Sequence, residues 1–453
     1  MEINTAIVAG TGKSGISATK LLVNHGVKVY LFDENKDRDI EAIKEKTGDS
    51  ELVQIELGEL GEDALSSSQL MVISPGIPVD APFTDVVRNA GIPIWSEIEL
   101  AYHYGKGKIA AITGTNGKTT TTALVGEIVK AHNAKTIVVG NIGIPYTELC
   151  DTTDDDSDTV AEISSFQLET VIDFHPNVSA ILNLTPDHLN RHYTFENYGN
   201  VKFSITKNQT MDDVTVLNYD DEHTRAMGEK AKDHCHVVYF SRLEKPFGGV
   251  YVEDGDIILE DGDKKINVLA IKDLKLMGAH NVENVLAAVG ISYYMGVPVD
   301  VIRDVATSFK AVAHRIEYVD TVDGVAYYND SKGTNPDAAI KGIQAMVAPT
   351  FLIGGGYDKG SEYDEWIEAF DGKVKWLVLI GQTAQKIADC AKRHGFNSII
   401  FEENLQDAVA YCHENAVDGD AVLLSPACAS WGQFDNYEQR GDMFKEYVRS
   451  YKE

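Results

Sequence analysis

The chain has 453 residues, more than one hydrophobic core can organise, so two to four domains are expected. Its formal net charge of −30 argues against a nucleic-acid or lipid-surface partner, because both carry phosphate groups that the chain would repel. The five cysteines include no CxxC pair and there is no run of about eighteen apolar residues, so we expect no disulfide framework, no cysteine-based zinc site and no membrane span.

The first hundred residues alternate short β-rich runs with helical stretches. Strands are predicted at 6–9, 27–32, 70–73 and 92–95, and a helix at 14–25. Strands separated by helices indicate a parallel α/β sheet, so this block is predicted to be Rossmann-like. The opening MEINTAIVAGTG enters the first strand without the features of a signal peptide, and we therefore expect a cytoplasmic protein.

A glycine motif follows the first predicted strand. Gly10, Gly12 and Gly15 fit the pattern GxGxxG, and Asp33 ends the second predicted strand. By itself this spacing predicts a dinucleotide site, as in an NAD(P)-dependent oxidoreductase. The motif indicates a loop that can approach phosphates, however, and carries no redox chemistry of its own. Because a fuller nucleotide motif comes later in the chain, the oxidoreductase is kept only as an alternative.

The most informative stretch of the second block is IAAITGTNGKTTTTALVGEIV at 109–129. A buried strand is predicted to end at Thr113, and a loop bracketed by glycines leads into a helix. Backbone N–H groups from Gly114 to Lys118 are expected to point at phosphates, aided by the positive end of the helix. Lys118 would reach the β- and γ-phosphates, and the Thr119 hydroxyl would hold Mg²⁺. The loop is shorter than the general GxxxxGK[ST] form, because an isoleucine stands where that form has its first glycine.

Polar side chains follow the later strands of the same block. These strands are predicted at 138–140, 159–164 and 179–184. Glu162 lies where the second of them ends, and Asp187 and His188 follow the third. Such positions, at the carboxyl ends of neighbouring parallel strands, are where open α/β sheets bind ligands. Carboxylate oxygens with one imidazole suit Mg²⁺, so Glu162 and His188 are predicted to be magnesium ligands.

Three other features of this block have plainer interpretations. The acidic segment DTTDDDSD at 151–158 is predicted to be a solvated loop, because nothing imposes ligand geometry on it. Asn281 and Asn284 are three residues apart and share one face of a predicted helix. Lys202 on its own would be interpreted as a helix-surface residue.

The third block begins after the HRIE segment at 314–317, with strands predicted at 351–356, 376–381 and 421–426. Its polar loops hold Asp330, Lys332, Thr334, Asn335, Asp358, Lys359, Ser430 and Tyr437. We expect these loops to form an amino-acid site, with Arg315 covering the γ-phosphate. The chain is therefore predicted to be α/β with three domains: Rossmann-like at 1–104, a central P-loop ATPase-like parallel sheet at 105–312, and Rossmann-like at 313–453.

The short loop TGTNGKT resembles that of the Mur ligase and folylpolyglutamate synthetase superfamily, in which three domains use ATP to join an amino acid to a carboxylate. ISSFQLE, NDSKGTN and LLSPACASWGQFDNYEQRG are similar, in the same order and along the whole chain, to motifs of its D-glutamate-adding branch. The resemblance implies a ligase that adds D-glutamate to UDP-N-acetylmuramoyl-L-alanine through an acyl-phosphate, for peptidoglycan synthesis, releasing ADP and phosphate. The chain departs from the family pattern at AVAHR, at Gly333 and at Trp431.

The resemblance also implies roles for individual residues, including a second magnesium ion held by Lys202 after carbamylation by CO₂. The catalytic residues would be Lys118, Glu162, His188, Lys202 and Arg315. ATP would contact Gly114, Thr115, Asn116, Gly117, Lys118, Thr119, Thr120, Asn281, Asn284, Arg315, Asp330 and Lys332. Metal ligands would be Thr119, Glu162, His188 and Lys202. The UDP substrate would contact Lys13, Ser14, Asp33, Ser74, Gly76, Asn141, Gln167 and His188. D-Glutamate would contact Thr334, Lys359, Ser430 and Tyr437.

Several alternatives stay open at this point. A sister Mur-type ligase that adds a different amino acid is the strongest, and folylpolyglutamate synthetase is weakened by the UDP-type first domain. A non-catalytic P-loop module would bind nucleotide without releasing phosphate. In the ligase hypothesis we expect a monomer without nucleic-acid or membrane partners, whose domains close on their substrates to exclude water from the acyl-phosphate.

Overall fold

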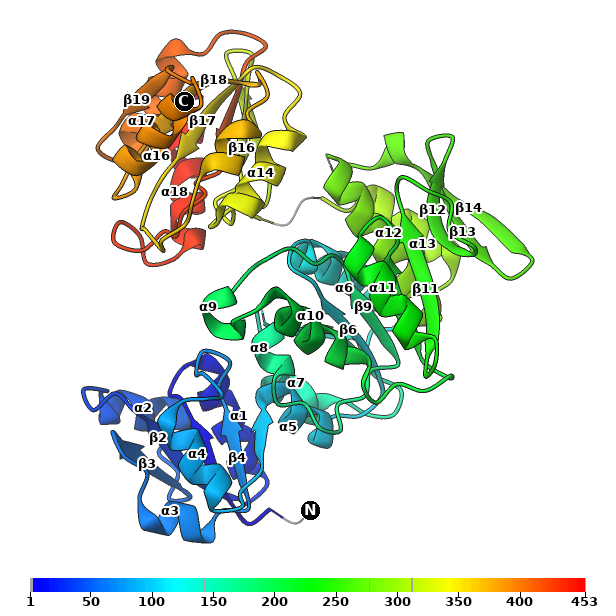
Figure 1. Cartoon of the computed structure of the whole chain (residues 1–453), viewed down its shortest axis with the longest axis vertical. Helices are drawn as coiled ribbons and strands as arrows, with labels where there is room; N and C mark the ends of the chain where they lie inside the picture. Colours follow the sequence, from blue (N-terminus) through cyan, green and yellow to red (C-terminus); the bar gives the residue numbers. More distant parts are fainter. Residues whose placement is uncertain (1–2, 142, 277, 311–312, 453) are drawn as a thin grey trace. The chain divides into compact units, whose positions relative to one another are not determined.

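The computed structural model describes residues 3–141, 143–276, 278–310 and 313–452 (Figure 1). It contains three parallel-rich sheets with helices between their strands, so the predicted three-domain α/β fold is confirmed. By contacts the chain divides into two compact units, residues 1–273 with 283–307 and residues 274–282 with 308–453. The finer limits 1–104, 105–312 and 313–453 stay a prediction. Ile142 of the GNIG segment, and Ala311 and Val312 of the AVAHR segment at the predicted second boundary, lie outside the described residues.

The N-terminal sheet has five parallel strands in the order β3-β2-β1-β4-β5. The strands are β1 (Thr5–Ala9), β2 (Lys28–Asp33), β3 (Val53–Leu57), β4 (Leu70–Ile73) and β5 (Ile94–Ser96). The helices are α1 (Lys13–Asn24), α2 (Ile40–Thr47), α3 (Glu62–Ser67), α4 (Pro82–Asn89) and α5 (Glu97–Tyr104). Ala6 and Val8 of β1 pack into one hydrophobic core, and Ile7 and Ala9 into another. Both faces of this sheet are therefore covered, as is typical of parallel sheets.

The central sheet has nine strands in the order β14-β13-β12-β11-β10-β9-β6-β8-β7. They are β6 (Lys108–Thr113), β7 (Ile137–Gly140), β8 (Asp158–Glu162), β9 (Val178–Ile181), β10 (Val214–Asn218), β11 (His236–Ser241), β12 (Gly249–Glu253), β13 (Asp256–Asp261) and β14 (Lys264–Ala270). Strands β6 to β12 pair in parallel with their neighbours in this order. The pairs β12–β13 and β13–β14 are antiparallel. Because β6 lies between β8 and β9, the segments that follow these three strands emerge at the same edge of the sheet.

The helices of this part of the chain are mostly short. They are α6 (Lys118–His132), α7 (Tyr146–Leu149), η1 (Cys150–Thr152), α8 (Ser165–Leu168), α9 (Leu189–His192), α10 (Phe195–Phe203), η2 (Ser204–Thr206), α11 (Glu222–Ala231), η3 (Ile271–Asp273), α12 (Ala279–Tyr294) and α13 (Val299–Ser308). The strand predicted to run to residue 164 ends earlier, at Glu162. Ser164 instead caps α8: its hydroxyl accepts from the Gln167 backbone N–H at 3.3 Å, and Gln167 Oε1 accepts from the Ser164 N–H at 2.9 Å.

The C-terminal sheet has the strand order β15-β16-β20-β17-β18-β19, parallel except for the β15–β16 hairpin. Its strands are β15 (Glu317–Val322), β16 (Val325–Asn329), β17 (Thr350–Gly354), β18 (Val374–Leu379), β19 (Ile399–Phe401) and β20 (Ala421–Leu424). Its helices are α14 (Pro336–Ala345), α15 (Asp364–Glu368), α16 (Ala384–Arg393), α17 (Leu405–Asn415) and α18 (Tyr437–Ser450). Leu352 packs into one core and Phe351 and Ile353 into another, so this sheet is also covered on both faces.

The acidic segment 151–158 is more ordered than the predicted solvated loop. Asp154 is exposed, as expected, but its Oδ2 lies 2.6 Å from Lys135 Nζ. Asp158 is buried as the first residue of β8 and accepts from Asn133 Nδ2 at 2.8 Å. The solvated-loop prediction is therefore wrong for Asp158, whose carboxylate helps to fix the end of the loop.

Within the described ranges, none of the helices is both long enough and apolar enough to pass through a bilayer.

Candidate phosphate-binding and ligand sites

The segment between β6 and α6 has the strand–loop–helix form that the sequence predicts. Gly114 and Gly117 adopt φ angles of +149° and +83°, which glycine tolerates best. A Cβ atom at Gly117 would lie 2.3 Å from Asn284 Oδ1, so no other residue fits there without displacement. Lys118 Nζ donates to the carbonyl oxygens of Gly114 and Thr115, each at 2.8 Å. The lysine side chain therefore folds over the loop that it is predicted to serve.

Asn183, which the sequence analysis did not single out, organises this loop. Its carbonyl oxygen accepts from the Thr115 N–H at 3.0 Å, and its Oδ1 accepts from the Asn116 N–H at 2.8 Å. Its Nδ2 in turn donates to the Asn116 carbonyl oxygen at 3.1 Å. Two of the N–H groups that were expected to point at phosphates are therefore directed at Asn183. The sequence feature that could have indicated this role is the position of Asn183, a polar residue just after β9 and four residues before Asp187.

A buried charged cluster lies under the loop. Glu162 and Lys202 are both 2% exposed. Lys202 Nζ donates to the Gly114 carbonyl oxygen at 2.9 Å, so two lysine side chains meet at one acceptor. Burial, and then repulsion from Lys118, lower the pKa of Lys202 well below its usual value, with Asp187 and Glu162 opposing the shift. The structure thus brings together Lys118, Glu162 and Lys202, which the sequence could only propose separately.

The remaining predicted metal ligands are Thr119 and His188. Thr119 is half-buried in the first turn of α6. His188 has a φ angle of +51°, its side chain is 50% exposed, and its ring contacts Phe166 with centroids 4.9 Å apart. In the described part of the chain, triads of His, Cys, Asp or Glu with ligand atoms within 4.8 Å of one another occur only at Asp364–Cys390–His394 and Glu99–His103–Asp173. The fit to Mg²⁺ therefore rests on donor chemistry: a carboxylate and a hydroxyl are the oxygen ligands that this ion prefers.

Two asparagines of α12 were predicted to contact the nucleotide. Asn281 and Asn284 are buried, at 3% and 6% exposure. Asn284 Oδ1 accepts from Thr121 Oγ1 at 3.3 Å and lies over Gly117, so it packs directly on the phosphate loop. Thr120 is also buried, at 3% exposure, in the first turn of α6.

The N-terminal glycine motif forms a tight β1–α1 turn. A Cβ atom at Gly15 would lie 1.8 Å from the Gly10 carbonyl oxygen, which explains the third glycine of the motif. Asp33 accepts from the N–H and Oγ1 of Thr11, at 3.2 and 2.6 Å, and from Arg38 Nε at 3.1 Å. Burial alone would raise the pKa of Asp33, but these donors and Asn35 outweigh it and lower the pKa. Asp33, the last residue of β2, thus anchors the β1–α1 turn.

The other predicted UDP-contacting residues lie around this turn and along the edge of the central sheet. Ser14 is half-buried at the start of α1, Ser74 is half-buried after β4, and Gly76 is exposed. Asn141 Nδ2 donates to Glu162 Oε1 at 3.0 Å, which joins the GNIG segment to the charged cluster.

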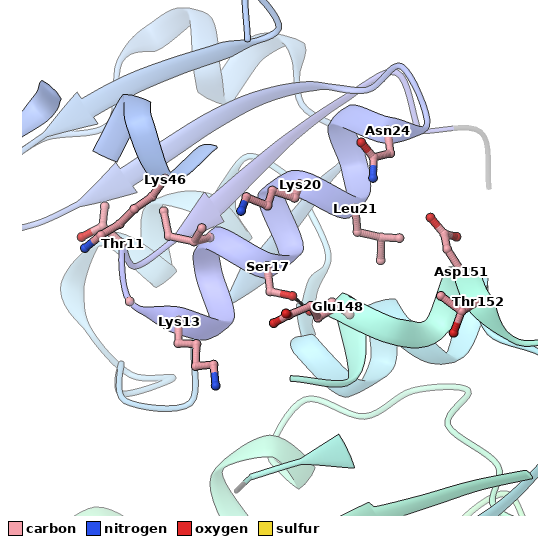
Figure 2. Close-up of a pocket in the computed structure, with 13 residues that line it drawn as sticks. Thr11, Lys13, Ser17, Lys20, Leu21, Asn24, Lys46, Glu148, Asp151 and Thr152 are labelled. Atoms are coloured by element: carbon pink, nitrogen blue, oxygen red, sulfur yellow. Dashed lines mark hydrogen bonds between the residues drawn. The ribbon is translucent and has the colours of Figure 1, made fainter. Parts of the chain in front are cut away.

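A cavity of about 600 Å³ runs beside α1, opposite the α7–η1 segment (Figure 2). Lys13, Ser17 and Lys20 extend from α1, and Glu148 and Asp151 lie on the opposite wall. Lys13 Nζ donates to the Gly143 carbonyl oxygen. Lys13 is the predicted substrate residue that lines this cavity, so the cavity adjoins the glycine-motif turn.

Gln167 is buried and belongs to a network that the sequence analysis missed. Its Nε2 lies 3.3 Å from Glu97 Oε2, and its Oε1 is engaged in capping α8. Glu97 Oε1 accepts from the N–H and Oγ1 of Thr147, at 2.8 and 3.0 Å. Burial raises the pKa of Glu97, with the Thr147 donors opposing it. A single glutamate at the start of α5 gave no pattern from which this network could be predicted.

In the C-terminal unit, Asp330 and its loop lie at the carboxyl end of β16. Asp330 is fully buried and accepts from Ser425 Oγ at 2.8 Å and from the Ile316 N–H at 3.3 Å. Burial raises its pKa to about 6, although Arg315 pulls in the opposite direction. Arg315 itself is half-buried.

Lys332 and Thr334 follow on the same loop. Lys332 Nζ lies 5.5 Å from the Tyr437 ring centroid, so the structure brings these two predicted residues together. Thr334 is half-buried, and its N–H donates to the Lys332 carbonyl oxygen at 2.8 Å.

Arg440, also missed from the sequence, ties two of the predicted loops together. It is fully buried, and its Nε donates to Ser331 Oγ at 2.9 Å. Its two terminal nitrogens donate to the carbonyl oxygens of Ser331 and Cys428, at 2.7 and 3.3 Å. The arginine of the EQRG motif thus has an architectural role beside the candidate amino-acid site.

Lys359 and Ser430 lie on two further loops that a backbone bridge between Tyr357 and Ala429 holds side by side. Lys359 Nζ is 5.1 Å from the Trp431 ring centroid, and the Tyr357 and Trp431 rings are 5.6 Å apart. Ser430 is buried, at 5% exposure. A cation and hydroxyl groups, which are the donors that an anionic amino acid requires, therefore occur on adjoining loops.

Comparison with known proteins identifies relatives along the whole chain. Family models match in three consecutive segments: the Mur ligase MurD-like N-terminal domain at 4–96, the Mur ligase middle domain at 112–292, and the Mur ligase glutamate ligase domain at 314–428. The UDP-N-acetylmuramoylalanine–D-glutamate ligase of Lachnospira eligens is 56% identical over 450 residues, which cover 99% of both chains. The protein of the same name from Clostridioides difficile is 46% identical over 98% of both chains.

Solved structures at lower identity share the fold. UDP-N-acetylmuramate–alanine ligase MurC from Thermotoga maritima has a TM-score of 0.61 at 19% identity and covers 99% of this chain and 100% of its own. MurF from Acinetobacter baumannii has a TM-score of 0.63 at 16% identity, covering 97% of this chain and 93% of its own. MurF ligase from Thermotoga maritima, solved in complex with ADP, has a TM-score of 0.59 at 16% identity, covering 98% of this chain and 95% of its own.

Proposed function

This chain belongs to the Mur ligase family, and from that premise we propose that it is the ATP-dependent ligase that adds D-glutamate to UDP-N-acetylmuramoyl-L-alanine in peptidoglycan precursor synthesis. The observation that carries the proposal is the 56% identity to a D-glutamate ligase over 99% of the chain. As part of the same proposal, the enzyme acts as a monomer in the cytoplasm.

The reaction has two steps. First, an oxygen of the substrate's alanyl carboxylate attacks the γ-phosphorus of ATP; the bond to the β-phosphate oxygen breaks, ADP leaves and an acyl-phosphate forms. Second, the amine of D-glutamate attacks the acyl carbon, inorganic phosphate leaves, and the new amide nitrogen gives up a proton. In phosphoryl transfer the protein mainly positions the reactants and neutralises the charge of the phosphates. The principal contribution of the protein is therefore the set of cations and backbone donors around the phosphates.

The ATP phosphates would lie on the loop from Gly114 to Thr120, which includes Thr115, Asn116, Gly117 and Thr119. Lys118 is the catalytic cation in this proposal, because its ammonium lies 2.8 Å from two carbonyl oxygens of the same loop. Asn284 would contact the nucleotide from its place over Gly117, with Asn281 one turn earlier. Arg315, Asp330 and Lys332 would complete the ATP contacts from the third domain.

Thr119, Glu162 and His188 would hold Mg²⁺, and Lys202 would hold a second ion after carbamylation. The bound ions would supply neutralisation of phosphate charge. Support for carbamylation comes from the lowered pKa of Lys202, since only a neutral amine reacts with CO₂. The resulting anion would also replace the repulsion between Lys202 and Lys118 with an attraction.

The nucleotide part of the second substrate would be held by the N-terminal turn, through Lys13, Ser14, Asp33, Ser74 and Gly76. Asn141, Gln167 and His188 would contact it from the central domain. D-Glutamate would be held by Lys359, Thr334, Ser430 and Tyr437. The pairing of a cation with hydroxyl groups on adjoining loops supports this last assignment.

The test is phosphate release from ATP and Mg²⁺ with UDP-N-acetylmuramoyl-L-alanine, supplying D-glutamate, L-glutamate, L-lysine or meso-diaminopimelate in turn. We expect release with D-glutamate and little with the others. Release with a different amino acid would keep the ligase mechanism and reassign the third-domain site to that substrate. No release with any of them would remove the ligase proposal.

A further inference from the structure

Two short helices of the C-terminal unit face each other with metal-binding side chains at matching spacing. On α15, Asp364 and Glu368 are four residues apart, and on α16 and its C-cap, Cys390 and His394 are also four residues apart. Residues at this spacing share one face of a helix. The Cys390 sulfur, a His394 ring nitrogen and an Asp364 carboxylate oxygen all lie within 4.8 Å of one another.

The His394 ring has a carboxylate near each of its two nitrogens. Its Nε2 lies 2.8 Å from Asp364 Oδ1. Its Nδ1, on the opposite side of the ring, lies 3.7 Å from Glu368 Oε1. A histidine that binds a metal through one nitrogen commonly directs the other at a carboxylate, which fixes the ring and raises its basicity.

We propose that Cys390, His394 and Asp364 bind a Zn²⁺ ion, with Glu368 holding the His394 ring. Thiolate, imidazole and carboxylate are all zinc ligands, and a tetrahedral ion with bonds of about 2.0–2.3 Å draws its ligand atoms together over separations of this size. Three protein ligands leave the fourth position to water. Sulfur together with nitrogen favours zinc over Mg²⁺, which takes oxygen ligands.

The cluster uses none of the residues proposed for the ligase reaction. The ligands lie on α15 and α16, whereas the residues proposed to hold Mg²⁺ are in the first compact unit. The lack of a CxxC pair predicted no cysteine-based zinc site. The Cys-x₃-His spacing becomes informative only when α15 brings a carboxylate against it.

Neighbouring charges set the strength of the site. Arg393 lies 3.5 Å from Asp364 and competes for its carboxylate, while Glu362 adds negative charge near Cys390. Because Arg393 competes for a ligand carboxylate, we expect an exchangeable ion and not a permanent structural one.

The primary test is a Co²⁺ titration of the full-length protein in excess Mg²⁺, followed by absorption spectroscopy. Cobalt bound to thiolate gives a near-ultraviolet charge-transfer band, which oxygen and nitrogen ligands do not give. We expect the band to reach its full intensity at one equivalent of Co²⁺ and to disappear when Zn²⁺ is added. In Cys390→Ser the band should be absent. The matched control Cys235→Ser, which alters a buried cysteine of the central domain, should keep the band. Absence of the band from the unaltered protein, or its persistence in Cys390→Ser, would overturn the proposal.

A second measurement does not depend on changing a buried residue. Zinc affinity is measured by competition with a chromophoric chelator in His394→Ala and Glu368→Gln, both at partly exposed positions. We expect at least a tenfold loss in His394→Ala, and a loss of about 10–100-fold in Glu368→Gln, as for other residues that orient a ligand. His132→Ala, which removes an exposed histidine of α6, should bind zinc like the unaltered protein. Equal affinity in all four proteins would show that the cluster is an ordinary ion pair.

Discussion

At the phosphate loop, Lys118 and Lys202 share one backbone acceptor, the Gly114 carbonyl oxygen, and Lys118 is the predicted catalytic cation. Lys118→Ala should lower the rate of phosphate release by at least about a hundredfold, because it removes a preorganised cation from the transferring phosphate. Glu162→Ala should be comparably inactive if its carboxylate holds the metal. Asp154→Ala is the control, since its exposed carboxylate pairs with Lys135 on a distant loop and activity should be unchanged. Near-normal turnover of Lys118→Ala would refute the phosphate-loop assignment.

The buried Lys202 is predicted to depend on dissolved CO₂. Depleting bicarbonate should lower activity, and adding it back should restore activity, because the neutral amine favoured by burial and by Lys118 is the form that reacts. Lys202→Arg should be inactive at any bicarbonate concentration. With ¹³C-labelled bicarbonate, a carbamate resonance should be present in the unaltered protein and in Lys230→Arg, an exposed control on α11, but absent from Lys202→Arg. A carbamate signal that survives in Lys202→Arg would place the modification elsewhere.

Lys359 tests the third-domain assignment. Lys359→Ala should raise the KM for D-glutamate by about tenfold or more with a smaller change in kcat, because a charge-assisted hydrogen bond contributes about 1.5–3 kcal/mol. The KM for ATP should be unchanged. Steady-state kinetics with each substrate varied in turn separates these effects. An equal rise in the KM for ATP would mean that Lys359 serves the nucleotide.

At the scale of elements, the β1–α1 turn shows why one glycine of a motif is essential and its neighbour is not. A Cβ atom at Gly15 would overlap the Gly10 carbonyl oxygen at 1.8 Å, whereas one at Gly12 would meet no atom within 4 Å. Gly12 also has an ordinary φ angle of −78°. Gly15→Ala should therefore lower the free energy of unfolding by about 1–3 kcal/mol, as overpacking does, and Gly12→Ala should leave it nearly unchanged. Urea denaturation of both variants is the measurement, and equal stability would mean that the turn relaxes without cost.

At the scale of the whole molecule, the net charge of −30 opposes compaction through self-repulsion. Raising NaCl from about 0.01 M to 0.1 M shortens the screening length from about 30 Å to about 10 Å. We therefore expect the thermal midpoint to rise over this range, and to rise equally in KCl, because screening is not specific to the cation. Differential scanning calorimetry checks this, and a midpoint independent of salt would mean that the charges are already compensated locally.

Local sequence determined much of the architecture. Runs such as Leu70–Ile73 and the stretch that ends at Thr113 were predicted as strands because buried parallel strands are short, apolar and bounded by turn residues. Gly114 and Gly117 identified the phosphate loop, because few other residues adopt the positive φ angles that it requires. The antiparallel extension β12–β14 was missed, because its strands are partly exposed and carry charged residues that weaken the pattern.

Only the tertiary structure decided which distant groups meet. Lys118 and Lys202 converge on one carbonyl oxygen, Asn183 takes two N–H groups of the loop, and Arg440 joins two loops of the third domain. The Asp364, Cys390 and His394 side chains likewise come together only where α15 meets α16. The physical reason is the range of the interactions: backbone preference and hydrophobic periodicity are local and can be read along the chain. Burial, pKa shifts and ligand geometry depend instead on residues that folding brings together from far apart.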